Sequence, residues 1–228
     1  FDDIDVAMMI HTNSDPTMAK TGIAASMNGF ISKLIRFVGK AAHAGGGPHL
    51  GVNALNAAMI AMSAIHAQRE TFRDEDSVRI HPIITKGGDI VNVVPADVRM
   101  ETFIRGKTKD AILDANAKVD RALRAGALAV GATVEIETMP GYLPLMNDPA
   151  LTDVFETNSK NLFDSETFTR MGHRASSTDL GDVSHLLPSI HPYMNGGSGT
   201  HHSKDWHISD KEMGYLGPAK SLATMAVD

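Results

Sequence analysis

The sequence predicts a mixed α/β protein of the α+β kind, built around a ferredoxin-like unit with two helices on one face of a four-stranded antiparallel sheet. Between residues 30 and 138 the apolar pattern follows the order strand, helix, strand, strand, helix, strand. Gly87, Gly88 and Pro95 separate neighbouring segments as turn residues do. Because many unrelated proteins use this order of elements, it predicts the fold and leaves the activity open.

Each segment of this unit has its own local signal. The strands are expected over residues 30–38, 78–85, 91–94 continued by 98–105, and 133–138. The helices are expected over 52–72 and 109–130, where apolar residues recur at helical spacing. The apolar stripe of the first helix consists of Val52, Leu55, Met59, Met62 and Ile65. That of the second consists of Ile112, Ala115, Val119, Leu123, Ala127 and Val130.

The flanking regions are less regular. Residues 5–11 form a short apolar run that predicts a buried strand ending at His11, and the polar stretch 12–28 predicts a connector. After Pro140 and Pro144, helices are expected over 149–163 and about 217–227, with a His- and Gly-rich region between them. The sequence contains no internal repeat.

Composition excludes several classes of function. The 228 residues carry a net charge of −6, which offers no basic surface for nucleic acid. There is no cysteine, which excludes disulfides, thiolate metal sites and a cysteine nucleophile, and no apolar run is long enough to span a membrane. The chain opens Phe-Asp-Asp-Ile-Asp with no signal-peptide pattern, so we expect it to begin inside a larger protein.

Histidine is the residue that suggests chemistry, with 11 copies, five of them between His185 and His207. His201 and His202 follow a flexible Asn-Gly-Gly-Ser-Gly-Thr approach and could reach a metal ion from a loop, or could be solvated loop residues. His11 lies at a strand end, where α/β proteins place ligands, although this position alone favours a structural histidine. The run from Ser176 to Ser184 could bind a polar substrate or simply cap a helix near Asp179.

His43 stands in the stretch GKAAHAGGGPHLGVNAL, beside three consecutive glycines. Glycine permits close approach of the backbone to a ligand, or a positive φ. The following Gly51-Val-Asn53 predicts a helix N-terminus whose free N–H groups favour an anion such as a carboxylate.

Four stretches together resemble the zinc amidohydrolases and peptidases of the Peptidase_M20 family. They are listed here in chain order: Gly39-Lys-Ala-Ala-His43 with Pro48-His-Leu-Gly51-Val-Asn53-Ala; Gly87-Gly with Asn92-Val-Val-Pro95 and Ile104-Arg105; Ser177-Thr-Asp-Leu-Gly-Asp-Val-Ser184; and His202-Ser. The resemblance covers essentially the whole chain and is nearest to the aminoacylase-like and aminobenzoyl-glutamate hydrolase branch. Ser189-Ile-His-Pro-Tyr193 is similar to the dipeptidases of that group.

The resemblance implies a ferredoxin-like lid and dimerisation domain inserted in an α/β zinc-hydrolase catalytic domain. It divides the chain into the end of a first catalytic segment at 1–22, the lid at 23–141 and a C-terminal catalytic segment at 142–228. It implies a homodimer formed through the lid, a cytoplasmic location, and no nucleic-acid or membrane partner.

The site residues follow from the same resemblance. His11 and His202 are implied metal ligands, with His201 as the alternative to His202. The resemblance implies zinc as the metal, with two divalent ions in the complete enzyme and manganese or cobalt as alternatives. His43 is implied to reach the partner subunit's site and to stabilise the oxyanion of the tetrahedral intermediate. Four further residues are implied to bind substrate, namely Asn92, Arg105, Ser177 and Thr178.

The implied reaction is metal-dependent hydrolysis of an amide bond in a small N-acyl amino acid, a dipeptide or an aminobenzoyl-glutamate-like substrate. The family's general base belongs to a Glu-Glu pair, and no Glu-Glu dipeptide occurs in this sequence. We therefore expect the chain to be an inactive or nearly inactive fragment of such a hydrolase. The alternative is a dimerisation or ligand-binding module without catalysis.

Overall fold

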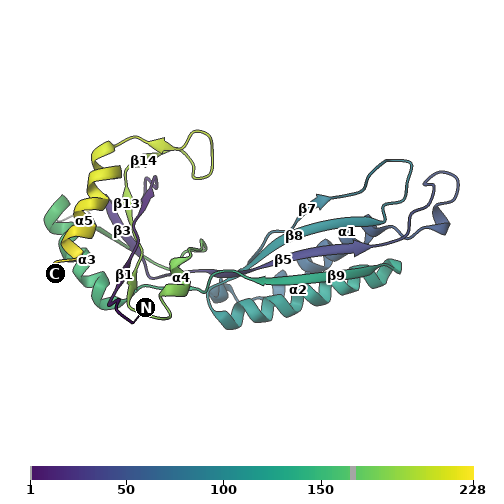
Figure 1. Ribbon diagram of the computed structural model, residues 1–228, viewed down its shortest axis with the longest axis horizontal. Helices are drawn as coiled ribbons and strands as arrows, with labels where there is room; N and C mark the ends of the chain where they lie inside the picture. Colours follow the sequence, from purple (N-terminus) through teal and green to yellow (C-terminus); the bar gives the residue numbers. More distant parts are fainter. Residues whose placement is uncertain (1, 165–167) are drawn as a thin grey trace. The chain divides into compact units, whose positions relative to one another are not determined.

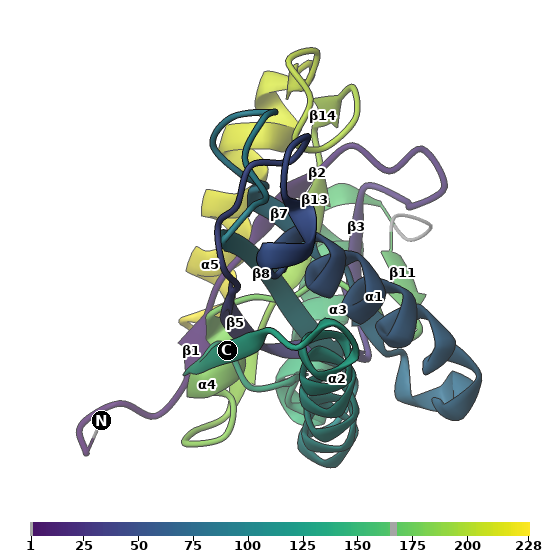
Figure 2. The same cartoon turned by 90° about the vertical axis from the view of Figure 1, so that its right-hand side faces the viewer.

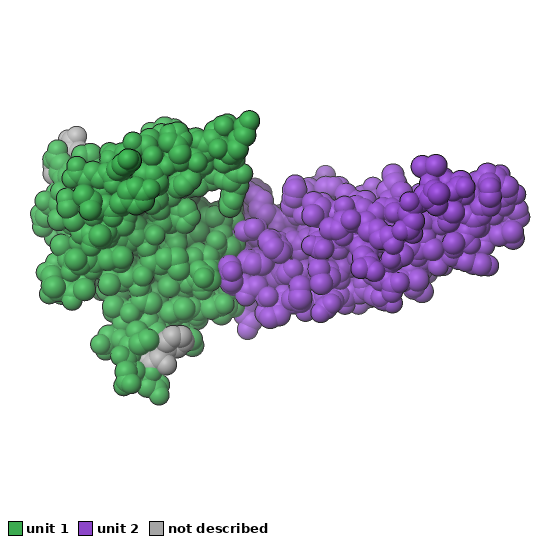
Figure 3. Space-filling view, turned by 45° about the horizontal axis from the view of Figure 1, so that its top comes forward, with its two compact units in different colours: residues 1–27, 143–228 green, residues 28–142 purple. Residues whose placement is uncertain are grey.

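The computed structural model describes residues 2–164 and 168–228, which form two compact units (Figure 3). Unit 1 consists of residues 1–27 and 143–228, and unit 2 consists of residues 28–142. Unit 2 begins five residues beyond the expected boundary because Thr21–Ala24 pairs with strands of unit 1. No helix in the described part of the chain is long and apolar enough to cross a bilayer.

Unit 2 is a mixed α/β unit with the predicted ferredoxin-like order of elements. Its antiparallel sheet has the strand order β6-β8-β5-β9, and β7 also pairs with β8. Figure 1 shows β7, β8, β5 and β9 side by side. The strands are β5 (Gly29–Val38), β6 (Arg79–Ile80), β7 (Ile83–Lys86), β8 (Asp97–Gly106) and β9 (Thr133–Pro140). The first predicted strand therefore lies at the centre, between the third and the fourth.

Helices α1 (Ala54–Ala67) and α2 (Lys109–Val130) pack on each other and on one face of this sheet (Figures 1 and 2). The α2 helix has the predicted bounds because its end signals are local. The Thr108 hydroxyl accepts a hydrogen bond from the amide of Ala111, and Gly131 ends the helix at φ +74°.

The buried face of α1 differs from the predicted stripe. Met59 is 56% exposed, and the face turned to the core is formed by Ala54, Ala57, Ala58, Ala61 and Ile65. Small residues are required there because α2 approaches closely. A Cβ added to Gly126 would lie 2.5 Å from the carbonyl oxygen of Ala57 and 2.6 Å from the Cβ of Ala61.

Three other predictions for unit 2 were wrong in detail. The strand expected over 78–85 is broken into β6 and β7 around Pro82, which lacks the N–H group that a continuous ladder needs. The segment 91–94 is a turn with one isolated bridge at Val93, and helix α1 ends at Ala67 before a 3₁₀ turn at Arg69–Thr71.

A charged side chain lies inside the core of unit 2. Lys33 lies in β5 and points to the helices, where its side chain is fully buried. Its ammonium lies 2.6 Å from the Asp120 carboxylate of α2 and donates to the Thr138 hydroxyl of β9 at 2.6 Å. The charge is thus paired within the sheet–helix interface, as a buried charge must be.

Unit 1 contains a mixed four-stranded sheet of order β11-β3-β13-β2. The strands are β2 (His11–Asn13), β3 (Thr21–Ala24), β11 (Phe168–Met171) and β13 (Pro192–Asn195). Helices α3 (Pro149–Phe163) and α5 (Gly217–Met225) pack against each other beside it, which confirms both predicted C-terminal helices (Figure 1). The remaining short elements are β1 (Ala7–Met8), β4 (Ser26–Met27), β10 (Leu145–Met146), α4 (Leu180–Val183), β12 (Ser189–Ile190), β14 (Gly197–Ser198) and β15 (His207–Ile208).

The connector expected over 12–28 was the largest error in unit 1, because this stretch contains strands β3 and β4 and most of β2. All four residues of β3 are buried, because neighbouring strands cover both of its edges. The run 5–11 is not one strand either: β1 ends at Met8, and His11 begins β2.

Candidate functional site

A cluster of aromatic and imidazole rings surrounds the start of β2 in unit 1. The ring centroid of His11 lies 5.7 Å from that of His201, 5.8 Å from that of Tyr193 and 6.1 Å from that of His191. Tyr193 lies in β13, and His191 is the residue before this strand. His201 comes from the loop after β14. Segments almost 190 residues apart in sequence therefore meet at one end of the sheet.

Hydrogen bonds fix the two outer histidines of this cluster. His201 Nε2 lies 2.9 Å from Oδ1 of the buried Asn13, the last residue of β2. His11 Nδ1 lies 2.7 Å from the backbone carbonyl oxygen of Thr12. Loss of hydration lowers the pKa of His201, and the neighbouring His11 charge lowers it further.

His191 is the buried member of the cluster, with 1% of its surface exposed. Its backbone amide donates to Asn147 Oδ1 at 2.7 Å, whereas its ring Nδ1 has no hydrogen-bond partner among the described residues. Burial lowers the pKa of His191 to about 4, and the nearby His11 charge acts in the same direction. The imidazole is therefore neutral at physiological pH.

Arg174 adds a cation to this end of unit 1. Its guanidinium carbon lies 5.6 Å from the ring centroid of Tyr193, and Nη1 lies 3.5 Å from Asp15 Oδ2. Hydrogen bonds from the side chain and amide of Thr17 hold the Asp15 pKa below its usual value. Sequence reasoning named neither Arg174 nor Asp15, because neither lies in a motif.

Of the adjacent histidines, the structure brings His201 to the cluster. His202 is exposed and has a left-handed backbone with φ +63°. The His201 ring is the one that contacts the His11 ring, with centroids 5.7 Å apart. His201, predicted as the alternative to His202, is therefore the histidine that lies beside His11.

Thr178 and Asp179 follow the capping interpretation. Asp179 Oδ1 accepts from the Leu180 amide at 3.1 Å at the start of α4, and the Thr178 hydroxyl donates to the same oxygen at 3.3 Å. The charge of Asp179 also acts on His191, so this turn lies close to the cluster. Ser177 is half-buried in the same turn.

Two imidazoles of this cluster, those of His11 and His201, are of the residue type that ligates zinc in proteins. Within residues 2–164 and 168–228, no three His, Asp or Glu side chains converge in a way that could hold a metal ion. His11 and His201 could supply two imidazole ligands, and a zinc site needs at least three protein ligands. The residues present therefore do not make a complete site.

A second group of predicted residues meets in unit 2. His43 is exposed and forms an isolated bridge with Val93, and the Ala44 amide donates to the Asn92 carbonyl oxygen at 2.9 Å. The loop that carries His43 is thus pinned to the loop between β7 and β8 through the backbone of Asn92. The structure thus brings His43 close to the backbone of Asn92.

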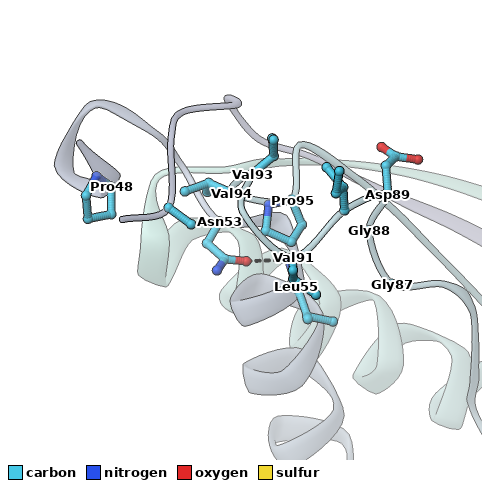
Figure 4. A pocket seen from close by; sticks show the side chains of 12 residues that line it. Pro48, Asn53, Leu55, Gly87, Gly88, Asp89, Val91, Val93, Val94 and Pro95 are labelled. Atoms are coloured by element: carbon cyan, nitrogen blue, oxygen red, sulfur yellow. Dashed lines mark hydrogen bonds between the residues drawn. The ribbon is translucent and has the colours of Figure 1, made fainter. Parts of the chain in front are cut away.

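A groove of about 660 Å³ lies beside these loops (Figure 4). Its wall is mainly aliphatic, with Leu55, Val91, Val93 and Val94 among the lining residues. The N-terminus of α1 was predicted to attract an anion, but its amides already have an acceptor within the chain. Asn53 Oδ1 accepts from the amides of Leu55 at 2.9 Å and Asn56 at 3.1 Å. That part of the anion-site prediction was wrong.

Arg105 lies at the opposite end of the sheet. It is opposite Phe30 in the ladder, and its guanidinium carbon lies 5.5 Å from the Phe30 ring and 5.4 Å from the Phe103 ring. Burial lowers the pKa of Arg105. Arg105 lies eight positions along β8 from Asp97, which is beside the His43 loops. Eight positions span roughly 26 Å along a strand, so Arg105 and His43 cannot touch one small ligand within unit 2.

Known proteins resemble this chain along its whole length. The family model of the peptidase dimerisation domain matches residues 26–130. The Xaa-Arg dipeptidase of Mus musculus is 30% identical over all of this chain and 53% of its own length. The indole-3-acetyl-aspartic acid hydrolase of Enterobacter agglomerans is 31% identical over 65% of this chain and 36% of its own length.

A solved amidase of the hydantoinase/carbamoylase family from Burkholderia vietnamiensis has the same fold. It superposes with a TM-score of 0.79 at 16% identity, covering 98% of this chain and 54% of that one. The chain spans about half the length of the curated relatives it matches.

Proposed function

Because the chain is a relative of the M20 peptidases and contains their dimerisation domain, we propose that it contributes to the hydrolysis of an amide bond in a small dipeptide or N-acyl amino acid. The observation that supports this most is the match of the whole chain to an Xaa-Arg dipeptidase. A dipeptide with a basic C-terminal residue is accordingly the first substrate class to test.

The proposed roles divide between the two units. In unit 1, His11 and either His201 or His202 contribute two ligands to a divalent metal, of which zinc is the first candidate. When bound, that metal would polarise the scissile carbonyl. In unit 2, His43 donates a hydrogen bond to the carbonyl oxygen as it becomes negative, and Asn92 holds the His43 loop. Ser177, Thr178 and Arg105 are proposed contacts for the polar ends of the substrate.

The test is an assay of the full-length gene product with dipeptides ending in Arg or Lys and with p-aminobenzoyl-glutamate. We expect hydrolysis that a chelator abolishes and added zinc restores. Retention of dimerisation with no hydrolysis of any of these substrates would favour the alternative, a dimerisation module without catalysis.

A homodimer through unit 2 is part of the same proposal. Its sheet has two open edges, and these differ in chemistry. Among the described strands β7 pairs only with β8, and it exposes Ile83 (51%) and Ile84 (38%). The other edge strand, β9, exposes the carboxylates of Glu135 and Glu137. Charged edges resist pairing and apolar edges invite it, so β7 is the proposed dimer edge.

The substitution Ile83→Lys is expected to raise the dissociation constant of the dimer about tenfold or more. Across a two-fold axis the substituted strands lie side by side, so the two new charges repel. Ile83 faces Glu101 on β8, which can accept the lysine, so the monomer is expected to stay folded. Sedimentation velocity measures the effect, with Glu137→Lys on β9 as the control. If the dissociation constant of the Ile83→Lys dimer is unchanged, the interface does not lie at β7.

Zinc is expected to bind this chain weakly, because the proposed ligand pair of His11 and His201 supplies fewer protein ligands than a zinc site needs. His201→Ala and His11→Ala should each lower the affinity about tenfold or more, and His202→Ala should leave it unchanged. Competition with a chelating dye measures all three variants. Loss of binding in His202→Ala with retention in His201→Ala would reverse the choice between the two histidines.

A further inference from the structure

The turn that follows His43 folds back onto its imidazole ring. The backbone amide of Gly45 donates to His43 Nδ1 at 3.1 Å, and the amide of Gly46 donates to the same atom at 2.9 Å. The Gly47 amide closes the turn on the His43 carbonyl oxygen at 3.0 Å. One ring nitrogen therefore receives two N–H groups from its own loop.

Two donors on Nδ1 decide where the ring proton lies. A neutral imidazole carries one N–H, and its other nitrogen has a lone pair that can accept. Because Nδ1 accepts from both amides, the proton of the neutral ring resides on Nε2. A ring turned by 180° would present Cδ2 to these amides in place of the nitrogen acceptor, and both hydrogen bonds from the turn to the ring would be lost.

The glycines were expected to permit a positive φ or a close approach to a ligand, and none of Gly45, Gly46 and Gly47 has a positive φ. Among the described residues, the glycines with positive φ are Gly88, Gly131 and Gly199. A Cβ added to Gly45 or Gly46 would lie 3.5 Å or more from the His43 ring, which is ordinary contact. The turn supplies the backbone N–H groups of Gly45 and Gly46 to the His43 ring.

We propose that the amides of Gly45 and Gly46 fix His43 as the Nε2–H tautomer, so that an exposed loop of unit 2 presents one oriented hydrogen-bond donor. The ligand that such a donor takes is an oxygen with excess negative charge, such as a polarised carbonyl or an oxyanion. Nδ1 is unavailable as a base or as a metal ligand while it accepts from the turn. The identification of that oxygen as the substrate's rests on the proposed function; the tautomer does not.

Long-range ¹H–¹⁵N NMR of the histidine rings in this chain tests the tautomer without any assay of activity. We expect a pyridine-type shift for Nδ1 of His43 and a pyrrole-type shift for Nε2. Gly46→Pro, which removes one donor, should produce a mixture of tautomers, whereas Gly46→Ala, which keeps the N–H, should match the wild type. A proton on Nδ1 in the wild type, or equal populations of the two forms, would overturn the proposal.

A second measurement covers the case in which Gly46→Pro disrupts the loop. The amides of Gly45 and Gly46 should lose protection from hydrogen exchange in His43→Ala and keep it in His43→Asn, because Oδ1 of asparagine can accept where Nδ1 does. Equal protection in the wild type and His43→Ala would show that the ring does not hold these amides. If the tautomer is as expected and His43→Asn does not alter catalysis, the proposed function fails and the tautomer assignment stands.

Discussion

Replacement of His43 by asparagine in the full-length gene product is expected to lower kcat roughly 100-fold or more, with little change in KM or metal content. Asparagine retains an acceptor for the Gly45 and Gly46 amides, so the turn is kept. It has no donor at the position of Nε2, so only the hydrogen bond to the developing oxyanion is lost. Such a bond acts in the transition state more than in the ground state, and its removal appears in kcat.

Two variants separate this donor from the loop that carries it. His43→Gln places an N–H group near the position of Nε2 and should recover part of the activity. His49 lies six residues on, exposed in the short 3₁₀ turn Pro48–Leu50, and His49→Ala should have a milder effect. Steady-state kinetics of the three variants make the comparison, and a loss in His49→Ala equal to that in His43→Asn would contradict the assignment.

Action across a dimer has a sharper signature than a lower rate. Mixing His43→Asn chains with His11→Ala chains should restore activity, because one site of the heterodimer then combines an intact His11 with an intact His43. Neither homodimer has a complete site. If subunit exchange is demonstrated and activity does not return, His43 serves its own chain or none.

The parts of the fold that the sequence predicted are those whose signals are local. Helix α2 was predicted to the residue, because Thr108 and Gly131 mark its ends and its apolar residues repeat along the chain. The buried face of α1 was not, because alanines that admit a close neighbour carry little hydrophobic signal beside Met59. Close packing against Gly126 depends on a residue more than 60 positions later.

Unit 1 was harder to predict because its sheet joins distant segments. Strand β3 pairs with β11 and β13, well over 100 residues later, and nothing within residues 12–28 reveals those partners. Contacts between distant segments also explain why the site was hard to predict from the sequence. The positions of His11 and His43 came from a family resemblance, whereas Arg174 and Asp15 meet only in three dimensions. Whether His201 or His202 faces His11 depends on the backbone of one loop.

The largest expected effect on stability is that of Asp120→Ala. Lys33 is fully buried, and Asp120, with 27% of its side chain exposed, is its only carboxylate partner in the described ion pairs. Removing that carboxylate leaves the ammonium buried with the Thr138 hydroxyl alone. Breaking a buried ion pair in this way costs about 3 kcal/mol or more, because the remaining charge keeps its desolvation penalty without the attraction.

Lys33→Met is expected to cost little, since a methionine of similar length fills the space without a charge. In the Lys33→Met background, Asp120→Ala should then be nearly neutral, so the two substitutions are strongly coupled. Urea unfolding followed by circular dichroism measures the cycle. Trp206, the one tryptophan of the sequence, lies in unit 1, so its fluorescence should report a transition that these variants leave in place. Additive effects of the two substitutions would mean that the Lys33 charge is stabilised by water rather than by Asp120, and that the interface between α2 and the sheet is less tightly closed than the 2.6 Å contact implies.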